Sequence, residues 1–324
     1  MTFPVKFGAF VPQGWKLELS EISGAERKWA RLKEVALTLE SEGYDSIWVY
    51  DHFHNVPRPS GEAVFECWTT MAALAELTTT VRLGQMVGCA GYRPPAVLAK
   101  IASNVDVISG GRLEWGIGAG WYEGEFLGYG IPFDAPKVRI GKLEETVEIV
   151  TALWRDPTTT YKGRYFQLEG AQCDPKPLQQ PHPPVWIGGS GRQLTLRVVA
   201  RHADKANFGG NAGEWAEARE TLKGHCKTVG RDEESIEKTW SPNCLVRQTE
   251  AEVRALFDAG KASLFNEPYD SWVAGNLVGT PEQVCEKIAQ YVALGCTYFV
   301  PWFTDYPEEQ TLRLFAEQVM PEFR

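Results

Sequence analysis

The chain has 324 residues, of which 44% are hydrophobic and 12% aromatic, and it carries a formal net charge of −9. This composition is typical of a soluble globular protein, and no apolar run approaches the ~18 residues of a transmembrane helix. A negative charge spread over the chain repels nucleic acid and anionic lipid, so we expect neither as a partner. We expect one domain over residues 1–324, because barrels of this size commonly form a single domain.

The cysteines and the first residues of the chain bear on its compartment. The seven cysteines are odd in number and include no C-x-x-C pair, which favours reduced thiols over a disulfide framework or a zinc site. The N-terminus has no basic stretch followed by an apolar one, so we expect no export. The sequence therefore predicts a cytoplasmic protein.

Short β-like runs alternate with amphipathic helical runs from Lys6 onward. This alternation predicts consecutive βα units, and eight of them predict closure into an α/β structure of the (β/α)8 TIM-barrel type. The expected strands are Lys6–Val11, Asp45–Tyr50, Val81–Val87, Arg112–Ile117, Pro184–Ile187, Lys205–Phe208, Thr239–Val246 and Thr297–Trp302.

Apolar stripes and capping signals mark the helices between these strands. Residues 98–108 and 140–154 carry apolar side chains at intervals of three and four. Residues 280–283 combine an N-cap hydroxyl, a proline at the first helical position and a capping-box glutamine. Three tryptophans at helix and strand positions are expected to fill the core: Trp29, Trp154 and Trp186.

Three connections, at about 118–138, 156–183 and 247–279, are longer than a βα loop requires. The first and third follow strands, so we expect them to build the rim of the active site at the C-terminal ends of the strands. The second leads into a strand and is expected to wrap across the opposite face in an extended conformation.

A glycine-rich turn, Gly188-Gly189-Ser190-Gly191, follows the apolar residues 185–187 and precedes a helical stretch. Glycine allows positive φ and a close approach of backbone N–H groups to an anion, and a helix N-terminus adds partial positive charge. The turn therefore predicts a phosphate site. The same residues could instead form a tight βα connection that binds no ligand.

Another strand ends in Asp51-His52-Phe53, where barrel enzymes place their catalytic groups. An imidazole ordinarily titrates near ~6.5, which suits proton transfer at neutral pH, so His52 is the candidate general base or acid. His52 could instead bond to backbone at the strand end. His54 is expected to point to solvent.

His52 and His54 also form an H-x-H pair, which some barrel hydrolases use to hold zinc. Such sites need further imidazoles at other strand ends, and the fifth and sixth expected strands supply none. His182 and His202 are expected at the opposite face of the barrel. We therefore expect no metal site.

Four segments stand in a characteristic order and spacing: Asp51–Phe53, Tyr92–Lys100, Asp106–Leu113 with Gly116–Trp121, and Pro184–Gly191. Together they resemble the bacterial-luciferase-like (β/α)8 superfamily, and within it the branch that uses the deazaflavin coenzyme F420. The resemblance covers residues 5–210 and again 277–281, whereas residues 210–276 match only in pattern.

The resemblance implies that a planar cofactor ring lies over the barrel mouth, above a non-proline cis peptide bond near Met86-Val87-Gly88. It implies that the turn at 188–191 holds the phosphate of the cofactor tail. Asp51 and His52 match a pair beside the cofactor, in which the histidine transfers a proton, while Asp51 could orient His52 or bond the ring. The implied cofactor-binding residues are Asp51, Met86, Val87, Gly88, Gly120, Gly188, Gly189, Ser190 and Gly191.

Trp121 departs from the family pattern. The sugar-phosphate dehydrogenases of this branch have an acidic glutamate at this position, so a sugar phosphate is not the expected substrate. Aromatic side chains predict instead a pocket for a small, flat or hydrophobic molecule. The expected pocket residues are Phe10, Gln13, Trp121, Asn207 and Trp302, of which Gln13 and Asn207 could equally make structural hydrogen bonds.

These observations predict an F420-dependent oxidoreductase that transfers a hydride between the deazaflavin and a small organic substrate. The alternative is a monooxygenase of the same superfamily that uses reduced FMN and oxygen. A third hypothesis is a binding protein on the same barrel, which would hold its ligand without turnover. Relatives commonly form homodimers, so we expect one here.

Overall fold

The computed structural model of the protein describes residues 4–189, 191–260 and 267–324. In these residues eight parallel strands close into a barrel, because β3 pairs with both β2 and β5 and so joins the ends of the sheet. The barrel strands are β1 (Lys6–Phe10), β2 (Ser46–Val49), β3 (Arg82–Gln85), β5 (Leu113–Gly118), β8 (Val185–Gly188), β9 (Lys205–Phe208), β10 (Glu237–Trp240) and β13 (Cys296–Phe299). A short strand, β4 (Gly88–Cys89), also pairs with β5. The predicted (β/α)8 barrel is confirmed.

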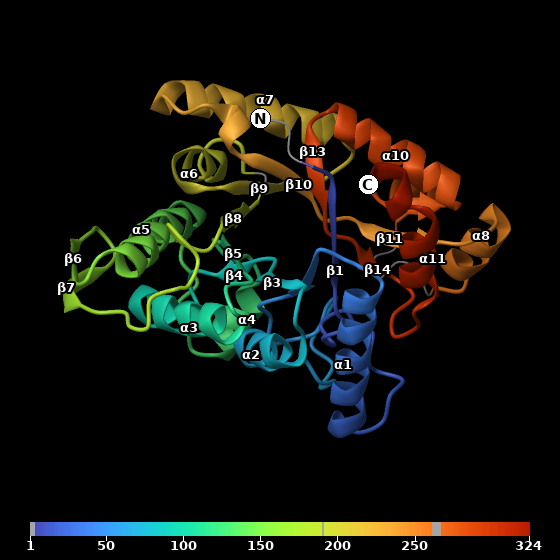
Figure 1. The fold of residues 1–324 in the computed structure, drawn as a ribbon, viewed down its shortest axis with the longest axis horizontal. Helices are drawn as coiled ribbons and strands as arrows, with labels where there is room; N and C mark the ends of the chain where they lie inside the picture. Colours follow the sequence, from blue (N-terminus) through green and yellow to red (C-terminus); the bar gives the residue numbers. More distant parts are fainter. Residues whose placement is uncertain (1–3, 190, 261–266) are drawn as a thin grey trace.

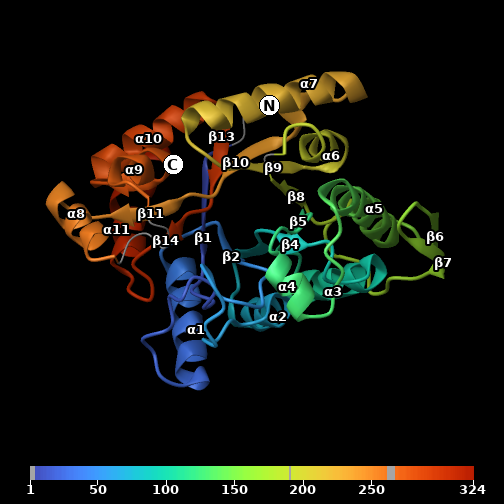
Figure 2. The same cartoon turned by 180° about the vertical axis from the view of Figure 1, so that it is seen from behind.

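Helices surround the barrel, as Figures 1 and 2 show from opposite sides. One follows each barrel strand: α1 (Ala25–Ser41), α2 (Cys67–Leu77), α3 (Pro95–Ile108), α5 (Pro136–Arg155), α6 (Thr195–His202), α7 (Ala212–Val229), α10 (Pro281–Ala293) and α11 (Gln310–Gln318). The predicted start of α10 is confirmed, because the Thr280 side chain accepts from the Gln283 N–H in a capping box. None of the helices in the described ranges is long and apolar enough to span a membrane.

The seventh and eighth expected strands are wrong in their extent. The stretches 239–246 and 297–302 are each broken, at Pro242 and Pro301, because proline has no N–H to continue a strand ladder. Beyond each proline the chain leaves the barrel and enters a separate three-stranded parallel sheet. The strands of that sheet are β11 (Asn243–Val246), β12 (Leu277–Gly279) and β14 (Trp302–Phe303).

The long connections carry elements of their own. The first contains α4 (Glu123–Gly128), and the third contains α8 (Glu250–Asp258) and α9 (Tyr269–Gly275). The second contains an antiparallel hairpin that was not expected, and Figure 1 shows it projecting beside α5. The hairpin strands are β6 (Thr159–Lys162) and β7 (Gln167–Ala171).

The rest of the second connection crosses the N-terminal face of the barrel, as predicted. The Gln179 amide donates to Asp106 Oδ1 (2.7 Å) and to the backbone oxygen of Leu113 (2.8 Å), the first residue of β5. This connection therefore lies at the end of the barrel where β5 begins.

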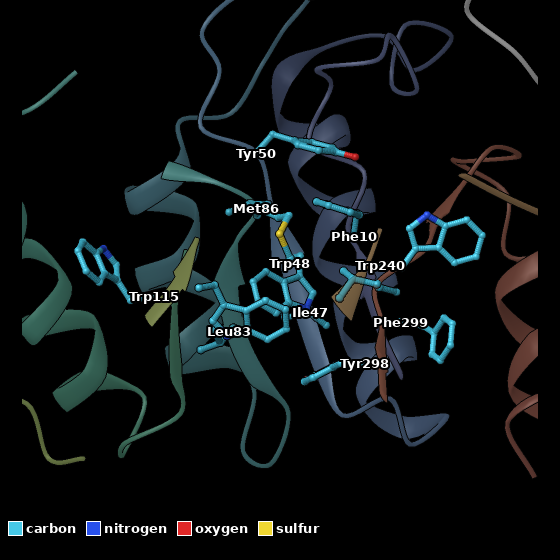
Figure 3. Packing of buried hydrophobic residues seen from close by; sticks show 14 of the residues in the cluster. Phe10, Ile47, Trp48, Tyr50, Leu83, Met86, Trp115, Trp240, Tyr298 and Phe299 are labelled. Atoms are coloured by element: carbon cyan, nitrogen blue, oxygen red, sulfur yellow. The ribbon is translucent and has the colours of Figure 1, made fainter. Parts of the chain in front are cut away.

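Large aromatic side chains fill the barrel interior, and Figure 3 shows part of this packing. The ring centroid of Trp48 lies 4.5 Å from that of Trp186, which lies 5.1 Å from that of Tyr298. All three side chains are buried, and so is Trp154, while Trp29 packs against the core as a partly buried residue. Of the three tryptophans expected in the core, Trp154 and Trp186 are part of it, and Trp29 lies at its edge.

Candidate active site

A cavity of about 580 Å³, the first cavity, opens at one end of the barrel. It is lined by residues at the C-terminal ends of β1, β2, β3, β5, β8 and β9, the face where (β/α)8 enzymes place their active sites. In Figure 3, Phe10, Tyr50 and Met86 lie toward one end of the packed core, and all three line this cavity. Its volume falls within the range of small-molecule sites.

Most of the residues singled out from the sequence meet in the first cavity. Those in its lining are Phe10, Asp51, His52, Met86, Val87, Gly88, Gly120, Trp121, Gly188, Gly189 and Asn207. Three others lie outside the lining: Gln13, Gly191 and Trp302. Ser190 falls outside the described residues. The structure thus brings the strand-2 histidine and the glycine turn to one site.

Gln13 makes structural hydrogen bonds, one of the two uses left open for it. Its buried amide donates to the backbone oxygens of Tyr50 and Phe65, and its oxygen accepts from the Tyr50 N–H. These bonds use the side chain to tie the end of β2 to the segment before α2. Asn207 also bonds within the protein, to the hydroxyl groups of Thr239 and Ser241, although it lines the cavity.

His52 is held by a buried carboxylate from another element. Its Nδ1 lies 2.7 Å from Oε2 of Glu125, a fully buried residue of α4. Glu125 also accepts from the Tyr92 hydroxyl (2.6 Å) and from the N–H groups of Phe53 (2.7 Å) and His54 (2.9 Å). Burial alone would raise the pKa of Glu125, but these hydrogen bonds, led by that from His52, lower it. An ionised carboxylate only accepts, so Nδ1 carries the hydrogen and Nε2 is the atom that can exchange a proton.

Asp51 does not orient His52, although the sequence left that role open to it. The Asp51 carboxylate accepts two hydrogen bonds from the Arg93 guanidinium (2.7 and 3.0 Å) and one from the Cys89 N–H (2.9 Å). Adjacent side chains of an extended chain point in opposite directions, which places Asp51 and His52 among different partners. The orienting group is Glu125.

Glycines make room where the chain bends after β3. The Met86–Val87 peptide bond is cis, as the resemblance implied. A Cβ at Gly188 would lie 2.8 Å from Val87 Cγ1, and one at Gly118 would lie 2.6 Å from Val87 Cγ2. Gly189 has φ +123°, which also favours glycine. The Val87 side chain therefore excludes larger residues from the ends of β5 and β8.

Two features make one side of the first cavity electropositive. Helix α6 begins at Thr195, which lines the cavity, and its first turn has no acidic residue. Arg139 of α5 lines the cavity as well, and its guanidinium donates to the backbone oxygens of Gly120 (3.2 Å) and Asp134 (2.5 Å). It makes no ion pair with a carboxylate in the described part of the chain. A helix N-terminus and an uncompensated guanidinium suit a phosphate group.

Aromatic rings surround His52. Trp15 stacks on it with ring centroids 4.3 Å apart and planes at 1°, and Phe10 stacks on Tyr50 at 4.2 Å. Trp121 meets His52 edge to face at 5.8 Å and is 61% exposed, which places it at the mouth of the cavity. The site therefore offers flat apolar surfaces next to a titratable group.

Histidines other than His52 do not line the first cavity. His54 is half-buried with its ring centroid 5.6 Å from that of Tyr129, so the expectation that it points to solvent is wrong. Among the described residues, one group of three could hold a metal ion, with ligand atoms within 4.8 Å of one another. It consists of Glu144 and Glu148 of α5 and His202 of α6, away from the lining of the first cavity.

The charged residues of the site that were missed in the sequence include Glu125, Arg93, Arg139 and Lys16. Glu125 is 73 positions from His52 and is one of several acidic residues in the 118–138 connection. Only its position in a connection expected at the rim of the active site indicated that it could belong to the site. Arg93 belongs to one of the segments that carry the resemblance, and this was a usable signal. Arg139 directly precedes the apolar stripe of α5, where a charged residue is ordinarily solvent-exposed.

The fold and the site define a (β/α)8 enzyme with a cavity of small-molecule size that a histidine lines. The chain belongs to the luciferase-like monooxygenase family, whose model matches residues 5–270. The protein is therefore an oxidoreductase of the luciferase-like type.

Known relatives include both F420-dependent and flavin-dependent enzymes. An F420-dependent glucose-6-phosphate dehydrogenase from Amycolatopsis mediterranei is 29% identical over 324 residues, which cover 90% of this chain and 94% of that protein. An FMNH(2)-dependent dimethylsulfone monooxygenase from Pseudomonas putida is 26% identical over 269 residues, 71% of each chain. The crystal structure of monooxygenase RslO1 from Streptomyces bottropensis matches with a TM-score of 0.80 at 23% identity, covering 98% of this chain and 100% of that one.

Proposed function

We propose that the protein is an F420-dependent oxidoreductase that transfers a hydride between the deazaflavin and a small, apolar or aromatic organic substrate. The observation that carries this proposal is the His52–Glu125 pair, because its imidazole lines the same cavity as Gly188 and Gly189 at the end of β8. The F420-dependent relative from Amycolatopsis mediterranei supports the choice of cofactor.

The residues of the first cavity fit a cofactor with a planar ring and an anionic tail. Arg139 and the N-terminus of α6 would hold the phosphate, and Gly188 and Gly189 keep the backbone there open. Residues 86–88 would lie under the ring, and Asp51 beside it. When bound, F420 supplies the carbon that gives or takes the hydride, while the protein supplies geometry and proton transfer.

His52 would complete the redox step. Loss or gain of a hydride at a C–H bond leaves a proton to be removed from, or added to, a neighbouring O–H or N–H group. Nε2 of His52 would exchange this proton, while Glu125 keeps Nδ1–H in place and Trp15 fixes the plane of the ring. The ionised carboxylate would also stabilise the imidazolium that forms.

The substrate side of the proposal comes from the aromatic rings. Phe10, Tyr50, Trp15 and Trp121 offer flat apolar surfaces at the mouth of the barrel. The resemblance puts Trp121 where the sugar-phosphate dehydrogenases have an acidic glutamate, which argues against a sugar phosphate in the first cavity.

A flavin-dependent monooxygenase is the second candidate, and the Pseudomonas putida relative favours it. Equilibrium binding of F420 and of FMN to the cofactor-free protein separates the two, followed by anaerobic turnover with F420 and by oxygen uptake with reduced FMN. We expect submicromolar binding of F420, at least tenfold weaker binding of FMN, and turnover without oxygen. Tighter binding of FMN together with oxygen uptake would establish the monooxygenase instead.

We also propose that the protein is a homodimer in the cytoplasm. Light scattering on the purified protein should give twice the chain mass of 36.2 kDa. A mass of 36.2 kDa would show a monomer.

A further inference from the structure

A cavity of about 360 Å³, the outer cavity, lies between α5, α6 and the β6–β7 hairpin. Figures 1 and 2 show α5 and α6 side by side. Helix α5 contributes Glu144 and Glu148 to the lining of the outer cavity, and α6 contributes Arg197 and Arg201. Neither glutamate lines the first cavity, so the two cavities present different groups to a ligand.

A histidine of α6 faces the two glutamates of α5. Glu144 and Glu148 lie on the same side of α5, because they are four residues apart in the helix. Nε2 of His202, the last residue of α6, lies 3.7 Å from Oε1 of Glu144 and 3.7 Å from Oε1 of Glu148. The three side chains can therefore offer one ligand atom each to a single ion, with these atoms within 4.8 Å of one another.

The contacts between these three side chains are not hydrogen bonds. An N···O separation of 3.7 Å exceeds that of a hydrogen bond, and His202 Nε2 has no hydrogen-bond partner among the described residues. If Nε2 carries no hydrogen, its lone pair faces two carboxylate oxygens. If it carries one, that hydrogen lies too far from both oxygens. A cation placed between the three atoms would interact favourably with all of them.

The separations suit a zinc ion. Zinc binds imidazole nitrogen and carboxylate oxygen at about 2.1 Å, so two ligands of a tetrahedral ion lie about 3.4 Å apart. The observed 3.7 Å is close to this value, and small side-chain rotations would bring the ligand atoms onto one ion. Mg²⁺ and Ca²⁺ prefer sites made of oxygen ligands, so the imidazole favours zinc over these ions.

An ion can reach this group from the outer cavity. The side chain of Glu148 is 40% exposed and that of Glu144 is 19% exposed, and both line the cavity. Nε2 of His202 is itself covered, so the ion would bind the carboxylates first and then exchange a water molecule for the imidazole nitrogen. Its fourth position would remain open to water.

Neighbouring side chains hold both carboxylates in place. The Tyr161 hydroxyl donates to Oε2 of Glu148 at 2.5 Å, while Oε1 faces His202. The Arg201 guanidinium donates to Oε1 of Glu144 at 2.6 Å. Hydrogen bonds of this kind orient metal ligands. Arg201 and three other basic residues line the outer cavity and oppose a cation, so we expect micromolar rather than tighter binding.

We propose that Glu144, Glu148 and His202 bind one zinc ion, which ties α5 to α6. The expectation of no metal site concerned histidines at strand ends, whereas these ligands lie on helices. The inference does not rest on the proposed function. The ion would stabilise the fold and take no part in hydride transfer, because none of its three ligands lines the first cavity.

Calorimetric titration with zinc chloride tests the proposal on the cofactor-free full-length protein, after removal of metals with EDTA and dialysis. We expect a dissociation constant of about 10 µM or lower for zinc and at least about 100-fold weaker binding of Mg²⁺. Zinc should also raise the melting temperature, because it binds the folded state. No binding of zinc, or equal affinity for zinc and Mg²⁺, would overturn the proposal.

Variants locate the ion. Glu148→Gln removes a charged ligand but keeps an acceptor for the Tyr161 hydroxyl, and it should weaken zinc binding about 10-fold or more. His202→Gln should weaken it by a similar factor. Glu220→Gln and His225→Gln, both on α7, are the matched controls and should leave zinc affinity unchanged. Unchanged affinity in either Glu148→Gln or His202→Gln would contradict the proposal, even if zinc binds elsewhere.

The same samples separate this inference from the proposed function. If neither F420 nor FMN binds but zinc does and its affinity depends on Glu148, the proposed function fails and the zinc site stands. If F420 binds and zinc does not, the zinc site fails alone.

Discussion

His52 is one half of a hydrogen-bonded pair with Glu125. The stacked Trp15 and the buried carboxylate together fix the ring so that Nε2 is the nitrogen open to a ligand. A histidine fixed in this way at a strand end has a defined tautomer and a defined direction of proton transfer.

Replacing His52 by alanine should therefore remove proton transfer and little else. Because general acid–base catalysis contributes about 10²–10⁴-fold, we expect turnover with F420 to fall by that factor while the dissociation constant of F420 stays within about 3-fold. Stopped-flow kinetics and equilibrium titration measure the two quantities. His182→Ala, outside the cavity, is the control. Full turnover in His52→Ala would show that another group moves the proton.

Glu125 is a positioning residue, and its substitution should change the tautomer of His52. Glu125→Gln replaces an obligate acceptor with an amide that can also donate, so the population of the Nδ1–H tautomer should fall, and turnover should drop about 10- to 100-fold. Nitrogen NMR of the imidazole reports the tautomer. Glu125→Asp keeps the carboxylate, so it should retain part of the Nδ1–H tautomer population and part of the turnover. An unchanged tautomer in Glu125→Gln would show that Glu125 serves the fold alone.

The two residues of this pair differ in how far the sequence reveals them. His52 follows an apolar strand in the motif Asp51-His52-Phe53, so its place at the barrel mouth could be predicted from local pattern. Glu125 could not be singled out, because its partners His52 and Tyr92 come from distant parts of the chain. Asp51 shows the same limit. As the sequence neighbour of His52 it was a candidate for the orienting group, but in the structure its carboxylate binds Arg93 instead.

At the scale of elements, the ends of β5 and β8 contain glycine because the Val87 side chain occupies the space in front of them. The glycine turn after β8 was predicted from its composition. Its contact with Val87 was not, since it depends on how the chain after β3 bends into the barrel mouth.

Gly188→Ala should disturb this junction. The new Cβ would lie 2.8 Å from Val87 Cγ1, so the valine must move, which we expect to cost about 1–3 kcal/mol of unfolding free energy and to weaken F420 binding. Urea denaturation and cofactor titration measure both effects. Gly209→Ala is the control, because a Cβ there meets nothing within 4 Å, and it should change stability by less than about 0.5 kcal/mol. Equal stability of the two variants would show that Val87 adapts without cost.

Prolines and turn residues explain the elements that were misjudged. Pro242 and Pro301 lie within runs that read as single strands, and each was a signal for a break that apolar periodicity alone concealed. The hairpin of β6 and β7 also had a local signal, the β-prone residues 159–161 before Gly163. The prolines that follow in the same connection, at 175, 177, 181, 183 and 184, favour an extended conformation and obscure this signal.

At the scale of the whole molecule, the barrel encloses charge as well as aromatic rings. Glu114 of β5 is 2% exposed and accepts from the Trp186 indole (2.5 Å), while Lys205 Nζ lies 3.1 Å from it and 3.4 Å from Glu237. Arg82 pairs with Glu114 from the N-terminal end. Burial alone would raise the pKa of Glu114, but Lys205, Arg82 and the Trp186 hydrogen bond lower it.

This network should make the unfolding free energy of the barrel depend on pH. The folded pKa of Glu114 is below the unfolded one, so its stabilising effect is complete above the unfolded pKa and is lost as pH falls through the folded pKa. Breaking a buried ion pair costs about 3–5 kcal/mol, and we expect Glu114→Gln to lose about that much near pH 7 and progressively less in acid. Urea denaturation at a series of pH values from 7 downward measures the unfolding free energy of the unchanged protein and of Glu114→Gln. Glu76→Gln, on the exposed side of α2, is the control. Parallel curves for Glu114→Gln and the unchanged protein would show that Glu114 is not the group whose protonation weakens the barrel.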